Sequence, residues 1–63
     1  MTAIETNTKK IVSRLQREGW TVEHGKEHDI LRHPAQPAAR IVVPRHRELS
    51  IGVARDIAKR AGW

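Results

Sequence analysis

The sequence predicts an α+β domain in which a helix, three strands of an antiparallel sheet and a second helix follow one another. Two segments, one starting at Thr6 and one spanning 51–61, place apolar residues at helical spacing. Between them, short runs with strand-like alternation are separated by glycine and proline. The chain has 63 residues, which suffice for one domain with a thin core. Three strands cannot bury both faces of a sheet unaided, so both helices are expected on one face.

The first helix is predicted from its caps and its apolar face. The residues able to cap its start are Thr6, Asn7 and Thr8. The apolar face consists of Ile11, Val12 and Leu15. Gly19 is expected to end the helix, since glycine is common just past a helix C-terminus. Residues 1–6 show little pattern and are expected to fray.

The next segment predicts a β-hairpin. Residues 20–24 alternate as in a strand, Gly25-Lys26 is suited to a turn, and 27–33 can form the second strand. In that second strand one face carries His28, Ile30 and Arg32, and the other carries Asp29, Leu31 and His33. Each face has one aliphatic residue, so the alternation leaves open which face is buried.

The rest of the chain predicts a third strand and the second helix. Residues 34–37 contain two prolines and are expected to form a loop, after which 40–43 is a strand rich in β-branched residues, closed by Pro44. A polar loop follows at 45–49. Ser50 is a good N-cap for a helix over 51–61, which Gly62 ends. The apolar stripe of this helix consists of Ala54, Ile57, Ala58 and Ala61.

The charge balance indicates an anionic partner. Twelve Lys and Arg residues against seven Asp and Glu give a net charge of +5, and the pI is about 10.8. A pI above about 9 is typical of nucleic-acid-binding domains, and neither helix has the bulky apolar face of a membrane-surface helix. There is no cysteine, no long apolar run and no signal-peptide pattern at the start. These features predict a cytoplasmic protein without disulfides or membrane spans.

Histidine is the residue type most suited to proton transfer here, and His28 is the best-placed example. It follows a glycine turn in a strongly basic chain, and imidazole can exchange a proton near neutral pH. A metal site is not expected. His24 and His28 lie four apart on a hairpin rather than on one helix, and the acidic residues do not cluster with the histidines. We therefore expect no metal and no cofactor.

Several pieces of the chain, in order, resemble the HicA toxins, the RNA-cleaving partners in HicA–HicB toxin–antitoxin pairs. The resemblance covers about residues 10–63. It rests on the sequences Glu18-Gly19-Trp20, Gly25-Lys26-Glu27-His28, His33-Pro34, Val43-Pro44-Arg45-His46 and Ile51-Gly52-Val53-Ala54-Arg55-Asp56-Ile57-Ala58-Lys59-Arg60-Ala61-Gly62. It implies a fold like that of the double-stranded RNA-binding domain, metal-independent cleavage of messenger RNA, and a HicB-type antitoxin as partner.

The resemblance also implies roles for particular residues. His28 takes the position of the family's catalytic histidine, while Lys26 stands where the family has a serine. Cations that hold the phosphate would add electrostatic stabilisation, and Lys26, Arg32 and Arg45 are the candidates. His46 and Arg47 are further candidate RNA contacts. The alternative is a non-catalytic module that binds double-stranded RNA, since a fold alone does not fix function. A DNA-binding helix pair is disfavoured, because three strands separate the helices.

Overall fold

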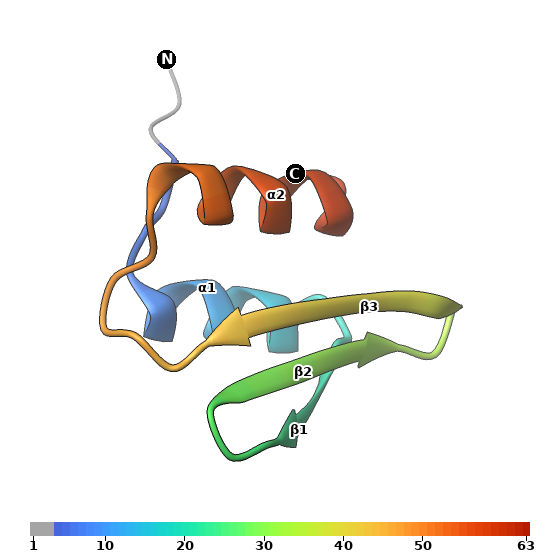
Figure 1. Cartoon of the computed structure of the whole chain (residues 1–63). Coiled ribbons are helices and arrows are strands. Elements are labelled where there is room, and N and C mark those ends of the chain that lie inside the picture. Colours follow the sequence, from blue (N-terminus) through green and yellow to red (C-terminus); the bar gives the residue numbers. More distant parts are fainter. Residues whose placement is uncertain (1–3) are drawn as a thin grey trace.

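The computed structural model describes residues 4–63 and confirms the predicted order of elements (Figure 1). The elements are α1 (Thr8–Arg17), β1 (Thr21–His24), β2 (His28–His33), β3 (Gln36–Pro44) and α2 (Ile51–Ala61). The strands form one antiparallel sheet in the order β1-β2-β3. The fold is therefore α+β, with a three-stranded open sheet and two helices.

Helix α1 begins and ends where local chemistry predicts. Of the three candidate caps, Asn7 is the N-cap, and its side chain accepts a hydrogen bond of 3.1 Å from the backbone N–H of Lys10. Gly19 follows the helix with a φ of +100°, a backbone conformation that favours glycine. The expected fraying of 1–6 includes residues 1–3, which lie outside the described residues, so it stays a prediction. Within the described part, the Thr6 carbonyl accepts a hydrogen bond of 2.8 Å from the N–H of Leu49.

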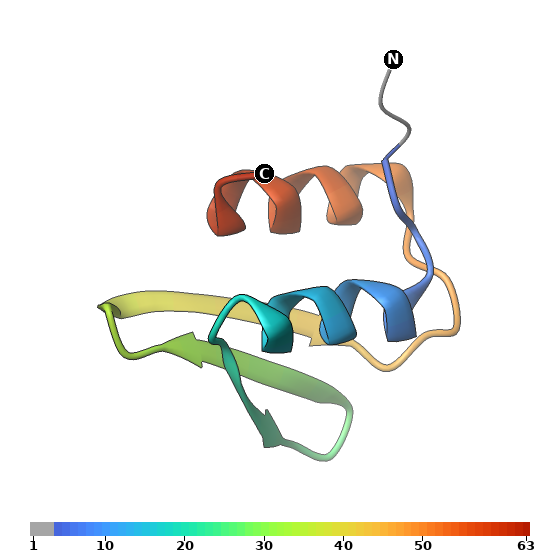
Figure 2. The same ribbon diagram turned by 180° about the vertical axis from the view of Figure 1, so that it is seen from behind.

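The register of the sheet settles which face is buried. Leu31 lies opposite Val22 on β1 and Ile41 on β3, and both Leu31 and Ile41 are fully buried. The neighbouring pair on the other face, Ile30 and Val42, is partly exposed. Figure 2 shows α1 in front of the buried face and α2 running alongside β3. We call the uncovered side of the sheet the open face.

Three predicted boundaries in the sheet were wrong. Strand β3 begins at Gln36, so the predicted loop over 34–37 shrinks to the two residues between β2 and β3. Pro37 is tolerated because β3 is an edge strand and the register shifts between Arg32 and His33, which leaves residues 37–39 unpaired with β2. The first hairpin loop spans residues 25–27 rather than the predicted 25–26, so β2 starts at His28 instead of residue 27. Strand β1 starts at Thr21 instead of residue 20.

Helix α2 matches its prediction from Ile51 to Ala61. The Ser50 side chain accepts a hydrogen bond of 3.3 Å from the N–H of Val53, and Gly62 ends the helix with a φ of +80°. Both helices and all but the first strand contribute to one core, which consists of Ile11, Leu15, Trp20, Leu31, Ile41, Val43, Leu49, Ala54 and Ile57. No helix within residues 4–63 is long and apolar enough to cross a membrane.

Candidate functional site

His28 is the first residue of β2 and is held by the hairpin backbone. The N–H of Gly25 donates a hydrogen bond of 3.0 Å to the His28 carbonyl. A Cβ on Gly25 would lie only 2.7 Å from that carbonyl oxygen, so this close approach requires glycine. On the other side, His28 lies opposite Pro44 of β3. Its backbone is therefore fixed by both neighbouring segments.

The His28 side chain lies on the open face and is exposed to solvent. It shares that face with Ile30, because Leu31 and Asp29 alternate to the buried side. Within residues 4–63 the His28 ring forms no hydrogen bond, whereas the rings of His24 and His33 do. The imidazole of His28 is thus free to exchange a proton with a bound molecule.

The predicted cations do not all surround His28. Lys26 does lie close in the chain, in the exposed loop two residues before it. Arg32 lies four residues further along β2, about 13 Å away at a rise of about 3.3 Å per residue. There it forms an ion pair of 3.2 Å with Glu23. The contact expected between Arg32 and the phosphate at His28 therefore stays a prediction.

Arg45, His46 and Arg47 gather instead at the start of α1. The backbone carbonyls of His46 and Arg47 accept hydrogen bonds from the Thr8 side-chain hydroxyl and the Thr8 N–H, respectively. All three residues line an open depression of about 500 Å³, together with Lys9. The depression lies on the helix side of the sheet, so these cations surround a surface next to His28 rather than the His28 ring itself.

Sequence reasoning missed a histidine–carboxylate pair beside the predicted site. His24 Nδ1 lies 3.1 Å from Asp29 Oδ1, and Arg45 also binds this oxygen, through Nε at 3.2 Å and Nη2 at 3.1 Å. Partial burial raises the pKa of Asp29, but the hydrogen bonds from His24 and Arg45 outweigh it and lower the pKa overall. The carboxylate thus stays ionised and orients the ring. The feature that reveals this pair is the sheet register, which places His24 directly opposite Asp29.

His33 has a structural role in this arrangement. Its Nδ1 accepts a hydrogen bond of 3.1 Å from the N–H of Ala35, so its Nε2 is the nitrogen that donates to the Glu18 carbonyl at 3.0 Å. The ring also meets Trp20 edge-on, with centroids 5.2 Å apart. Both ring nitrogens are occupied, and the residue joins the end of β2 to the end of α1.

Fold and site together define a small basic α+β domain with one uncovered sheet face and an exposed histidine at the hairpin. Residues 8–63, which include every helix and strand, match the protein-family model described as the HicA toxin of bacterial toxin–antitoxin systems. The chain therefore belongs to the HicA toxin family, which confirms the resemblance found in the sequence. A search of curated proteins found no match.

Family membership gives the chain the toxin role in a toxin–antitoxin pair and implies an antitoxin protein as its partner. Within residues 4–63 no group of three or more His, Cys, Asp or Glu side chains is arranged to hold a metal ion.

Proposed function

We propose that this toxin is an endoribonuclease that cleaves messenger RNA in the cytoplasm without a metal ion, using His28 for proton transfer. The observation that carries the proposal is the exposed imidazole of His28, which forms no hydrogen bond within residues 4–63 and stands at a glycine-fixed hairpin in a member of the HicA toxin family. The net charge of +5 supports a polyanionic substrate, because cations bind phosphate whatever the base sequence.

RNA supplies its own nucleophile for this reaction. The ribose 2′-oxygen attacks the adjacent phosphorus, its proton passes to an imidazole nitrogen of His28, and the bond from phosphorus to the 5′-oxygen breaks. The departing 5′-oxygen takes a proton from solvent, which leaves a 2′,3′-cyclic phosphate and a 5′-hydroxyl. Proton transfer by a positioned side chain contributes about 10²–10⁴-fold to such a rate. Lys26 is the cation nearest in the chain to stabilise the developing charge.

The remaining cations have a second role in this proposal. Lys9, Arg45 and Arg47 line the depression at the start of α1, next to the hairpin. They bind the phosphates that flank the cleaved one, with His46 as a further contact. The antitoxin, of HicB type, inhibits by covering His28, and an acidic contact surface on it would speed association with this basic protein.

Cleavage by the wild type and the His28→Ala variant in the presence of a chelator tests the proposal. We expect the wild type alone to cut RNA and leave cyclic phosphates, while both proteins bind RNA with similar affinity. His28 is exposed, so the variant should keep its fold, which circular dichroism checks.

Cleavage by a folded His28→Ala protein would contradict the catalytic assignment. Activity lost on chelation would contradict metal independence. If both proteins bind double-stranded RNA and neither cuts RNA of any kind, the domain is a non-catalytic binding module instead.

A further inference from the structure

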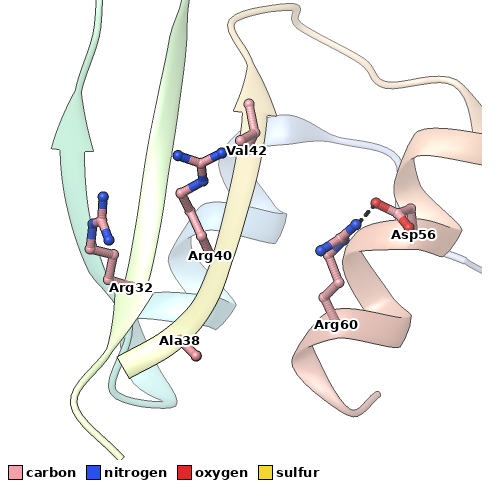
Figure 3. Close-up of a pocket in the computed structure, with 6 residues that line it drawn as sticks. All are labelled: Arg32, Ala38, Arg40, Val42, Asp56 and Arg60. Carbon is pink, nitrogen blue, oxygen red and sulfur yellow. Dashed lines mark hydrogen bonds and ion pairs between the residues drawn. The ribbon is translucent and has the colours of Figure 1, made fainter. Parts of the chain in front are cut away.

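A second depression, of about 510 Å³, lies where the open face of the sheet meets α2 (Figure 3). Arg32 of β2, Arg40 of β3 and Arg60 of α2 bring their guanidinium groups to it from three different elements. The other lining residues are Ala38, Val42 and Asp56. Only Arg32 was expected to contact a ligand, and it lies at the far end of β2 from His28. The depression is therefore separate from the proposed catalytic centre.

The charges in this depression are not balanced. Arg32 and Arg40 are directly opposite one another on paired strands, and like charges in that arrangement repel. Arg32 is paired with Glu23 at 3.2 Å and Arg60 with Asp56 at 2.9 Å. Arg40 forms no ion pair within residues 4–63. Three guanidinium groups thus share two carboxylates, and one more carboxylate would relieve the repulsion.

The existing ion pairs are open to exchange with a partner. The side chains of Arg32 and Arg60 are 45% and 57% exposed, and exposed pairs of this kind contribute little stability. A guanidinium group can hold a carboxylate through two parallel hydrogen bonds, which a partner could offer at each arginine. The three arginines can therefore bind incoming carboxylates without a large loss from breaking internal pairs.

The apolar residues of this surface favour a protein partner over RNA. Val42 is 41% exposed and lies opposite the half-buried Ile30, so aliphatic side chains border the arginines on the open face. None of the six lining residues is aromatic, so the depression offers no ring on which a base could stack. Arginine beside aliphatic groups is common at the centre of protein interfaces.

We infer that the Arg32–Arg40–Arg60 depression anchors carboxylates of the antitoxin, with aliphatic antitoxin side chains packed on Ile30 and Val42. This inference rests on the proposed function, because antitoxin binding here would inhibit RNA cleavage only if His28 carries out that reaction. His28 shares the open face and lies about 13 Å along β2 from Arg32. A standard interface covers about 800 Å² per partner, so a protein anchored at the arginines also covers the His28 ring.

Charge reversal at Arg40 tests the anchor, with Arg55→Glu as the matched control. Arg55 is also exposed and makes the same change in net charge, but it does not line the depression. Affinity is measured by calorimetry against the purified antitoxin encoded beside the toxin gene. We expect Arg40→Glu to weaken binding at least about 30-fold and Arg55→Glu by less than about threefold. The difference should shrink at 1 M salt, where charges are screened within about 3 Å.

RNA cleavage by the same variants separates this inference from the proposed function. Arg40→Glu should cleave RNA like the wild type and resist inhibition by the antitoxin, and Arg60→Glu should behave in the same way. Unchanged antitoxin affinity in both folded variants would overturn the anchor. So would lost RNA binding with normal antitoxin binding, which would assign the arginines to phosphate. If the wild type cuts no RNA but needs Arg40 for antitoxin binding, the anchor stands and the proposed function fails.

Discussion

His24 Nδ1 lies 3.1 Å from Asp29 Oδ1, while the ring of the neighbouring candidate, His28, lies on the opposite face of the same hairpin. A carboxylate on one ring nitrogen leaves the other nitrogen free, as in histidines that act as general bases. The hairpin therefore presents two imidazoles to opposite sides, and a single phosphate cannot contact both. The proposed role of His28 makes a clear prediction for His24.

We predict that His24→Gln keeps RNA cleavage within about threefold of the wild type, whereas His28→Gln loses at least about 100-fold. The His24 side chain is 74% exposed, and Asp29 keeps its bonds to Arg45 in the variant. Stability should change by less than about 1 kcal/mol. Initial cleavage rates of the two glutamine variants provide the measurement. The reverse order of activities would assign proton transfer to His24.

The protein should lose stability in acid, with Asp29 as one cause. Because the pKa of Asp29 is lower in the folded protein than in the unfolded chain, the unfolded chain binds more protons at acidic pH. The stabilisation is present above about pH 4, the ordinary range of this group, and disappears as the pH falls through the lowered folded-state value. Thermal unfolding between pH 2 and 7 measures this. Asp29→Asn should show a shallower fall in Tm than the wild type, and parallel curves would refute the assignment.

The contacts of Trp63 with Glu18 and Arg14 should contribute to stability. Trp63 Nε1 donates a hydrogen bond of 2.6 Å to Glu18 Oε1, and the Arg14 guanidinium lies 4.1 Å from the centre of the Trp63 ring. The hydrogen bond from Trp63 lowers the pKa of Glu18, burial opposes this, and Arg14 adds to the lowering. We predict that Trp63→Ala costs about 2 kcal/mol of unfolding free energy in urea. Trp63→Phe keeps the ring but not the N–H, so it should lose about half as much; equal losses would show that only the N–H matters.

Two glycines should respond in opposite ways to alanine. Gly19 has a φ of +100°, and a Cβ there would lie 2.8 Å from His33 Nε2, so Gly19→Ala should destabilise the protein by at least about 1 kcal/mol. Gly52 lies in the first turn of α2 with no atom within 4 Å of an added Cβ. Gly52→Ala should therefore stabilise by about 0.5 kcal/mol, since alanine has the higher helix propensity. Urea unfolding of both variants checks the signs, and a stabilising Gly19→Ala would show that His33 moves freely.

Local signals predicted the helices well because their caps depend on neighbouring residues. Helix α2 begins after Ser50 and ends before Gly62, as the sequence predicted. The sheet was harder. Ile30 and Leu31 are equally apolar, and only the packing of α1 and α2 decides that Leu31 is buried. Pro37 suggested a loop, yet an edge strand with a register shift accommodates it.

The arrangement of the candidate site likewise depends on contacts between residues that are distant in the sequence. The exposure of His28 at the hairpin agrees with the glycine turn before it, but its catalytic role stays a prediction. The bonds of Asp29 to His24 and Arg45 depend on strand register and on the turn after β3, which join residues up to 16 positions apart. The Arg32–Arg40–Arg60 depression needs three elements to be in place. Neither arrangement leaves a pattern of neighbouring residues in the sequence.

The bonds between Thr8 and the segment after β3 have a consequence for synthesis. Thr8 binds the carbonyls of His46 and Arg47, and Thr6 binds Leu49, so the start of α1 is secured by residues about 40 positions later. These bonds cannot form until residues 46–49 have been synthesised and have left the ribosome, so a shorter nascent chain lacks the contacts that secure the start of α1. The cationic surface at the start of α1 therefore depends on contacts that the chain can make only after β3 and the turn behind it have been synthesised.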